Sequence, residues 1–196
     1  MLKRIFTIFL TTILIATLAI SLVGCGPEEN EAKALVQSLV KQSFELNEIY
    51  FGDGLKYKDT GNPNDIYMPV LETEKYVTKS QLVSATKRVF AEGYANSLIH
   101  MAFNGVQSEI NVNSVQSQFM VMGDDDWLYI NKNYKSAVEN FTVYDFNTIT
   151  ITYTSSRFIE ATVNGTLMTD KGEKSIIVNV TLICEDDQWR LNSATY

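Results

Sequence analysis

The run Thr148-Ile149-Thr150-Ile151-Thr152-Tyr153-Thr154 alternates threonine with large apolar or aromatic side chains, without a break. Successive side chains of a strand point to opposite faces of a sheet, so this run predicts a strand with one packed and one solvated face. Strand-forming runs follow at 157–169, 175–184 and 188–191, with turn sequences between them. The C-terminal part of the chain is therefore predicted to be an antiparallel meander.

The sequence before this meander contains helices and one more hairpin. The runs 115–122 and 127–130 flank a turn at 123–126 and are predicted to be paired strands. Further upstream, apolar side chains repeat at spacings of three, four and seven, which predicts a helix over 31–51 and a second helix from Thr78. Helices that precede a run of strands define the α+β class. We expect the N-terminal helices to pack on one face of a single twisted antiparallel sheet.

Two features locate the limits of the second helix. Thr78 and Gln81 have the spacing of a capping box, in which each side chain bonds the backbone N–H of the other residue. Gly93 is expected to divide the helix, because glycine weakens a helix interior.

The first 25 residues have the pattern of an export signal. Lys3 and Arg4 precede an apolar stretch that ends in Leu22-Val23-Gly24-Cys25. This ending matches the lipobox and resembles that of bacterial lipoproteins, in which the chain is cut before the cysteine and the cysteine is acylated. The alternative is an uncleaved membrane anchor. Both interpretations place the body outside the cytoplasm, because Lys3 and Arg4 stay inside.

These features divide the chain into three parts. Residues 1–24 are the predicted signal peptide, residues 25–31 are a tether lipidated at Cys25, and residues 32–196 are a single α+β domain. At about 3.4 Å per extended residue, the tether reaches roughly 20 Å. The predicted location is the extracytoplasmic face of the cell membrane, with the domain held close to the membrane by its lipid anchor.

The charge balance excludes one class of partner. The chain carries 23 acidic against 16 basic side chains, and two of the basic ones, Lys3 and Arg4, belong to the predicted signal peptide. An acidic body repels a phosphate backbone, so we expect no nucleic-acid partner. The acidic runs 124–126 and 185–187 are interpreted as solvated turns that form one acidic edge. They lack the spaced ligands of an EF-hand loop.

No catalytic signature stands out in the sequence. It has no nucleophile-elbow Gly-x-Ser-x-Gly, no P-loop and no dinucleotide-binding glycine motif. His100 is the only histidine, which excludes a multi-histidine metal site, and Cys184 lies in an apolar run that favours a buried thiol. We therefore predict a non-enzymatic protein with no catalytic residues, no metal and no cofactor.

The order of the predicted elements resembles the nuclear transport factor 2-like (cystatin-like) superfamily. The resemblance rests on the long first helix, the shorter helical pair and the closing sequence Gln188-Trp189-Arg190-Leu191-Asn192-Ser193. It implies a cone-shaped α+β fold with a cavity, for which Tyr94, His100 and Tyr144 are the candidate cavity residues. It also implies the alternative function, a small-molecule isomerase, dehydratase or hydrolase that works inside such a cavity.

A second resemblance is to the cell-wall DL-endopeptidase inhibitor family. It rests on the first helix, the extended Tyr67-Met68-Pro69-Val70, the helix start Thr78-Lys79-Ser80 and the strand Trp127-Leu128-Tyr129-Ile130. It implies a binding module whose partner is an envelope protein, a cysteine-type hydrolase of the cell wall. The polar segment 53–66 is then the candidate interaction loop, with Asp53, Asp59, Asp65 and the adjoining Tyr67 as its residues of interest.

Overall fold

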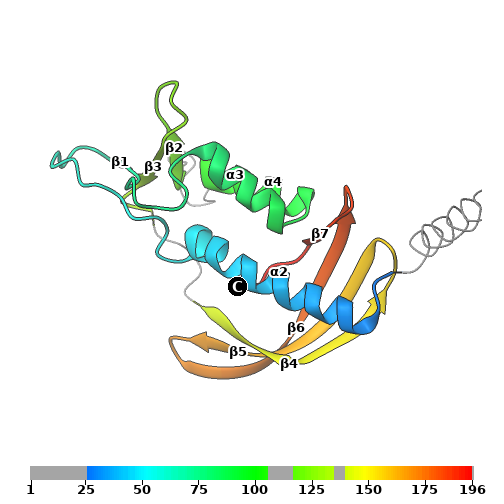
Figure 1. The fold of residues 1–196 in the computed structure, drawn as a ribbon. Coiled ribbons are helices and arrows are strands. Elements are labelled where there is room, and N and C mark those ends of the chain that lie inside the picture. Colours follow the sequence, from blue (N-terminus) through cyan, green and yellow to red (C-terminus); the bar gives the residue numbers. More distant parts are fainter. Residues whose placement is uncertain (1–25, 106–116, 135–139, 196) are drawn as a thin grey trace, which may run out of the picture.

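The computed structural model describes residues 26–105, 117–134 and 140–195 (Figure 1). Its elements in chain order are α2 (Glu29–Phe51), β1 (Tyr67–Pro69), α3 (Lys79–Val89), α4 (Glu92–Asn104), β2 (Phe119–Val121), β3 (Leu128–Asn131), β4 (Phe141–Thr154), β5 (Phe158–Thr169), β6 (Gly172–Glu185) and β7 (Gln188–Leu191). Helices combined with antiparallel sheets confirm the predicted α+β class.

The strands form two antiparallel sheets, so the expectation of a single sheet is wrong. The larger sheet has the order β4-β5-β6-β7 and contains the predicted meander. The smaller has the order β1-β3-β2, in which Met68 and Phe119 flank Ile130 from either side. Of the predicted strand 115–122, β2 covers 119–121, and residues 115–116 lie outside the described residues. The β2–β3 hairpin pairs with β1 as its third strand. The hairpin therefore belongs to a separate sheet and does not join the meander.

β4 begins earlier than the alternating run predicts, because a bulge interrupts its period. Asp145 pairs with Asn164, and residues 146–149 then lie opposite Val163 alone before pairing resumes at Thr150; a second shift of register follows between Ile151 and Tyr153. The bulge is fixed by Thr148, whose hydroxyl donates to the Asp145 carbonyl at 2.7 Å and accepts from the Asn164 N–H at 2.9 Å. An extra stretch of this kind bends a strand and shifts its alternation.

The limits of the helices agree with the sequence in one case and differ in two. α2 begins at Glu29, two residues before the predicted start. The capping box of α3 is confirmed, with the Gln81 N–H donating to Thr78 Oγ1 at 3.3 Å and the Thr78 N–H donating to Gln81 Oε1 at 3.2 Å. The division between α3 and α4 falls at Phe90 and not at Gly93, because the extended Phe90 is fully buried and pairs with β7.

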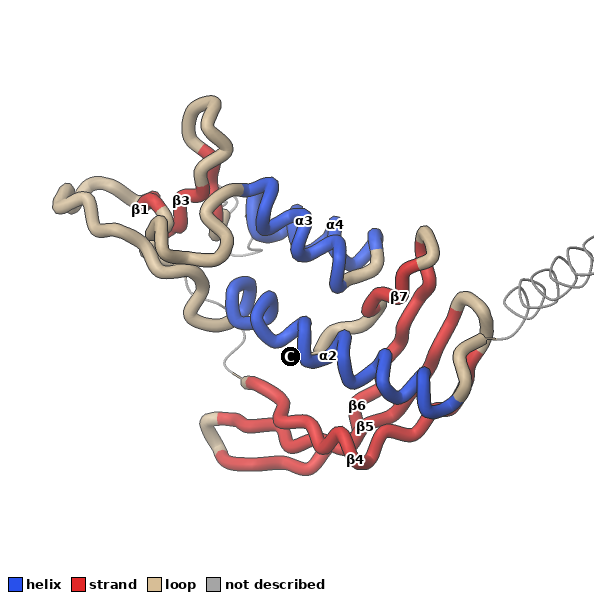
Figure 2. Tube along the Cα trace, viewed as in Figure 1, coloured by secondary structure: helices blue, strands red, loops and turns tan. Residues whose placement is uncertain are grey.

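α2 lies between the large sheet and the pair formed by α3 and α4 (Figure 2). On the sheet side, the ring of Phe44 lies 5.9 Å from that of Tyr144 and 6.4 Å from that of Phe146. A continuous core joins the helices to the inner face of the sheet, which we define as the face toward α2. Its fully buried members include Val36, Val40, Leu46, Phe90, Ile159, Leu182 and Leu191.

The residues that precede α2 pack against the turn between β4 and β5. Gly26 packs against Ser155, and the Thr154 hydroxyl donates to the Pro27 carbonyl at 3.4 Å. Because α2 begins at Glu29, the extended stretch is shorter than the predicted tether of residues 25–31. Among the described residues, we find no helix that combines the length and apolar character needed to cross a membrane.

A buried polar cluster fastens the C-terminus to α2. The hydroxyl of Thr195 lies 2.6 Å from the hydroxyl of Ser43 and accepts from the Asn47 side-chain amide at 3.0 Å. All three residues are buried, so none of these groups can turn to water when a partner is lost.

We expect Thr195→Val to lower the free energy of unfolding by about 1–2 kcal/mol, because it leaves the Asn47 amide without this acceptor while keeping the side-chain shape. Urea unfolding followed by circular dichroism measures the change. Thr150→Val, at an exposed position of β4, is the matched control and should stay within about 0.5 kcal/mol of wild type. If both variants lose the same free energy of unfolding, the polar cluster makes no specific contribution to stability.

Candidate functional site

The predicted interaction loop, residues 53–66, is an ordered extension of the small sheet (Figure 1). Tyr57 forms an antiparallel bridge with Val70. On either side of that bridge, the Lys58 N–H donates to the Pro69 carbonyl at 2.9 Å, and the Leu71 N–H donates to the Lys56 carbonyl at 3.0 Å. The first part of the loop therefore runs beside the end of β1 as an additional extended segment.

The carboxylates predicted for this loop are used inside it. Asp59 accepts from the Gly61 N–H at 2.9 Å, and Asp65 accepts from the Thr60 hydroxyl at 2.7 Å. Gly61 has φ +76°, a conformation that suits glycine. Asp53 lies apart from them at the end of α2, with its N–H bonded to the Glu48 carboxylate. Among the described residues no group of three or more acidic, cysteine or histidine side chains could hold a metal ion.

The far side of the loop is tied to the β2–β3 hairpin. The hydroxyl of Tyr67 lies 2.9 Å from that of Ser117, which precedes β2. Lys132, which follows β3, donates its N–H to the Ile66 carbonyl at 3.0 Å and its ammonium to the Pro63 carbonyl at 3.1 Å. Tyr67 thus fixes the base of the loop, and the loop's shape is set by bonds to three neighbouring segments.

Apolar side chains lie on this loop and beside it, and the sequence did not single out the two on the loop. Tyr57 is 42% exposed and Ile66 is 44% exposed. Beside them, Pro69, Trp127 and Tyr129 line an open hollow of about 560 Å³. We call loop 53–66 together with these three residues the distal surface. Trp127 precedes β3 and Tyr129 lies in it, and their period-two spacing was a usable signal that both side chains share one face. The lone Tyr57 and Ile66 offered no such signal.

The acidic turn at 124–126 connects the β2–β3 hairpin to the start of α3 by hydrogen bonds. Asp126 accepts from the Ser80 N–H at 2.9 Å and from the Ser80 hydroxyl, and its carbonyl accepts from the Lys79 N–H at 2.9 Å. The hydrogen bonds from Ser80 lower the pKa of the Asp126 carboxyl below its usual value. The turn at 124–126 thereby seats the hairpin on the start of α3. It lies at the other end of the molecule from the turn at 185–187, so the expected common acidic edge is wrong (Figure 1).

The three candidate cavity residues are not brought together. His100 is exposed on α4 and accepts a hydrogen bond from the Asn104 side-chain amide at 2.8 Å. The ring of Tyr94, also on α4, lies 5.2 Å from that of Phe90. Tyr144 lies on β4 across α2 from them, and its ring stacks on Phe146 at 5.8 Å.

Among the candidate cavity residues, Tyr144 has a buried phenol. Its hydroxyl is buried without a hydrogen-bond partner among the described residues, and burial raises its pKa to about 12. Its ring fills space between Phe44 and Phe146, so the phenol occupies the layer beneath α2. A phenol that keeps its proton to such a high pH is a poor general base near neutral pH.

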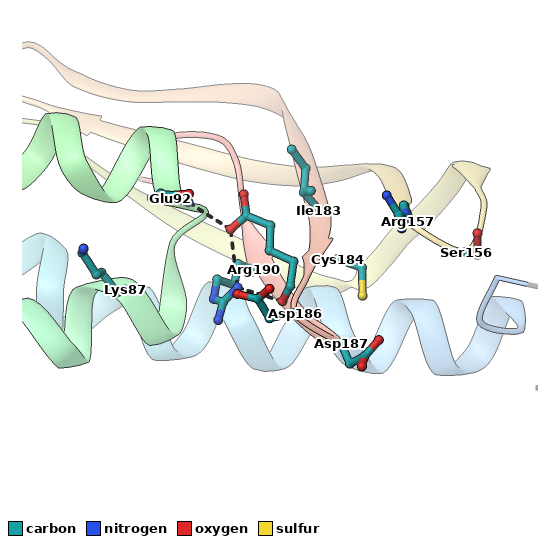
Figure 3. Close-up of a pocket in the computed structure, with 10 residues that line it drawn as sticks. Lys87, Glu92, Ser156, Arg157, Ile183, Cys184, Asp186, Asp187 and Arg190 are labelled. Carbon is teal, nitrogen blue, oxygen red and sulfur yellow. Dashed lines mark hydrogen bonds and ion pairs between the residues drawn. The ribbon is translucent and has the colours of Figure 1, made fainter. Parts of the chain in front are cut away.

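A hollow of about 1150 Å³ lies between the β6–β7 turn, the β4–β5 turn and the start of α4 (Figure 3). Arg190 lines it and donates to the Glu185 carbonyl at 2.8 Å and to the Gln188 side chain at 3.1 Å. The Glu185 carboxylate also accepts from the Glu92 N–H at 3.0 Å. These bonds join β6, β7 and α4, so Arg190 and Glu185 form a structural joint with the sequence-distant Glu92 that sequence patterns did not reveal.

The residues that line this hollow include acidic and basic side chains and one thiol. Cys184 is half-buried there, less enclosed than the apolar run predicts, and His100 is not among the lining residues. The turn itself needs two left-handed residues, Asp186 with φ 51° and Asp187 with φ 59°, the conformation of a tight two-residue hairpin. The acids at 185–187 therefore serve the turn and its joint with Arg190.

The chain has no match among protein-family models, and no curated protein matches it. The assignment of function accordingly rests on the geometry described above.

Proposed function

We propose that this chain is a lipid-anchored extracytoplasmic protein that binds a partner without catalysing a reaction, and that the partner is a cell-wall peptidase, which it inhibits. The observation that carries the proposal is the position of the distal surface. It lies at the opposite end of α2 from Gly26, the residue that follows the predicted lipidation site Cys25 (Figure 1).

The length of α2 separates the two ends. The helix has 23 residues, which at 1.5 Å per residue span about 34 Å. An acyl group on Cys25 holds one end of the helix at the membrane, and the loop that follows the other end then points toward the cell wall. An anchored inhibitor needs this arrangement, because its partner acts away from the bilayer.

The order of loop 53–66 favours binding. A loop whose conformation is already fixed loses little conformational entropy when a partner binds it. Asp59 and Asp65 supply that order through bonds within the loop, whereas Tyr57 and Ile66 remain available for contact. Tyrosine is one of the residue types that most often dominate interface energy, and Tyr57 lies on a fixed support here.

The packing beneath α2 supports an interaction role over the alternative of an enzyme with a cone-shaped cavity. Rings of Phe44, Tyr144 and Phe146 contact one another at this position. The candidate acid–base residues Tyr94 and His100 lie on another element and contact other neighbours.

An inhibition assay tests the proposal. The full-length lipoprotein in detergent micelles is titrated into a cysteine-type cell-wall endopeptidase that is hydrolysing a muropeptide. We expect slower hydrolysis with wild type, and a loss of potency of about tenfold or more in the double variant Tyr57→Ser, Ile66→Ser, because both exposed contacts are removed.

The control is Ile177→Ser, which removes an apolar side chain that is 69% exposed on the large sheet. This variant should inhibit as wild type does. If wild type fails to slow hydrolysis at high protein concentration across several such enzymes, the proposed partner is wrong. If the double variant and the control lose potency equally, the distal surface is not the contact.

A further inference from the structure

The residue after the predicted lipidation site is packed against the turn between β4 and β5. A side chain at Gly26 would place its first carbon 2.4 Å from the backbone carbonyl carbon of Ser155, so the contact requires glycine. The next residue, Pro27, accepts a hydrogen bond from Thr154. Cys25 is covalently joined to a residue that touches this turn, and the extended stretch before Glu29 spans about 10 Å at most.

Aromatic side chains flank the same turn. Tyr153 is 53% exposed, and its ring lies 6.4 Å from that of Phe158 across the β4–β5 pair. Ser156 and Arg157 are exposed at the tip between them, and Figure 3 shows both residues at the end of the sheet beside the incoming N-terminal chain. We call Tyr153, Ser156, Arg157 and Phe158 the proximal patch.

We propose that the proximal patch is a membrane-contact site, on which the anchored body rests against the lipid headgroups. The inference rests on the proposed lipidation of Cys25. Tyrosine rings and arginine side chains suit the membrane interface, because each has an apolar part and a polar end. The short tether keeps the patch at the bilayer surface, so even a contact too weak to recruit the free protein fixes the orientation of the anchored one.

The charges at this end indicate an aromatic contact and not an electrostatic one. Arg157 is the cation of the patch, while Glu28 precedes α2 and Asp186 and Asp187 lie on the adjacent β6–β7 turn (Figure 3). The acids outnumber the cation, so this end gains no net attraction from anionic lipid. We expect the depth to which the proximal patch enters the bilayer to be insensitive to the fraction of phosphatidylglycerol and to the salt concentration.

Brominated lipid, which quenches tryptophan at the bilayer, tests the contact. Full-length Tyr153→Trp, Tyr57→Trp and wild type are reconstituted in phosphatidylethanolamine and phosphatidylglycerol vesicles with bromine on the acyl chains. Both substitutions place a ring at a similarly exposed tyrosine, one on the proximal patch and one on the distal surface. We expect the quenched share of the emission to rise above wild type for Tyr153→Trp and to stay no higher than wild type for Tyr57→Trp.

Two further measurements separate the possible failures. Mass spectrometry reports the acyl group, which Cys25→Ala should abolish together with cleavage before residue 25. Hydrogen exchange of wild type should be slower at residues 155–158 in vesicles than in a soluble chain of residues 26–196, with loop 53–66 unchanged. An anchored protein in which Tyr153→Trp is quenched no more than wild type would overturn the contact while leaving the anchor and the distal surface intact. A protein without the acyl group would overturn both the anchor and the contact.

Discussion

Replacing Phe90 with alanine is expected to lower the free energy of unfolding by about 3–5 kcal/mol, because the ring is fully buried and its removal leaves a cavity. Phe90 also marks the joint between the helical layer and the large sheet. It forms a bridge with Leu191 of β7, and the N–H of the following Ala91 donates to the Leu191 carbonyl at 2.7 Å. The ring additionally packs on Tyr94.

Chemical denaturation followed by circular dichroism measures this loss. Phe141→Ala is the matched control, since Phe141 is 59% exposed on β4 and its removal should change stability by no more than about 0.5 kcal/mol. A loss below about 1 kcal/mol for Phe90→Ala would mean that the joint between α3, α4 and β7 is not a principal source of stability.

Raising the pH above about 10 is expected to remove stability that the buried Tyr50 supplies. Burial raises its pKa from 10.0 to about 12, although the hydrogen bond with Thr86 opposes the rise. Between these values the unfolded chain releases the phenolic proton and the folded chain keeps it. The unfolded state binds fewer protons, so the free energy of unfolding falls as the pH rises. The contribution is complete below about pH 10 and is lost toward pH 12; two pKa units correspond to about 2–3 kcal/mol.

Tyr50→Phe isolates this effect from other groups that titrate in the same range, Tyr144 among them. The free energy of unfolding is measured for wild type and variant at about pH 9 and at about pH 11.5. Wild type should lose about 2 kcal/mol more than the variant between the two pH values. Parallel losses in the two proteins would mean that Tyr50 titrates in the folded state as it does in the unfolded chain.

Local patterns in the sequence predicted much of the fold. The runs 157–169 and 175–184 correspond to β5 and β6, because long strands packed on one face keep a period of two. The capping box at Thr78 was visible because its two partners are three residues apart. In the small sheet the β2–β3 hairpin was predicted, but the addition of β1 was not. β1 has three residues, and its pairing with β3 depends on the tertiary arrangement of segments far apart in the chain.

The candidate site was likewise predicted from the sequence only in part. The polar composition of 53–66 indicated a loop, but whether Asp59 and Asp65 point outward or bond within the loop depends on the backbone geometry. Tyr57 and Ile66 are single apolar residues in a polar segment, so they form no repeating hydrophobic pattern from which their exposure could be predicted. The joint between Arg190 and the start of α4 arises from a tertiary contact that no spacing in the sequence encodes.

The bulge in β4 has a consequence for molecules that share a membrane. Within the described sheet β4 is one of the two edge strands and is 14 residues long, and such an edge can recruit an identical edge from another molecule. Under the proposed anchoring, copies diffuse in two dimensions and meet frequently. The bulge at 146–149 breaks the edge into two short segments, so two β4 strands cannot pair along their full length. It therefore protects crowded neighbours from edge-to-edge aggregation.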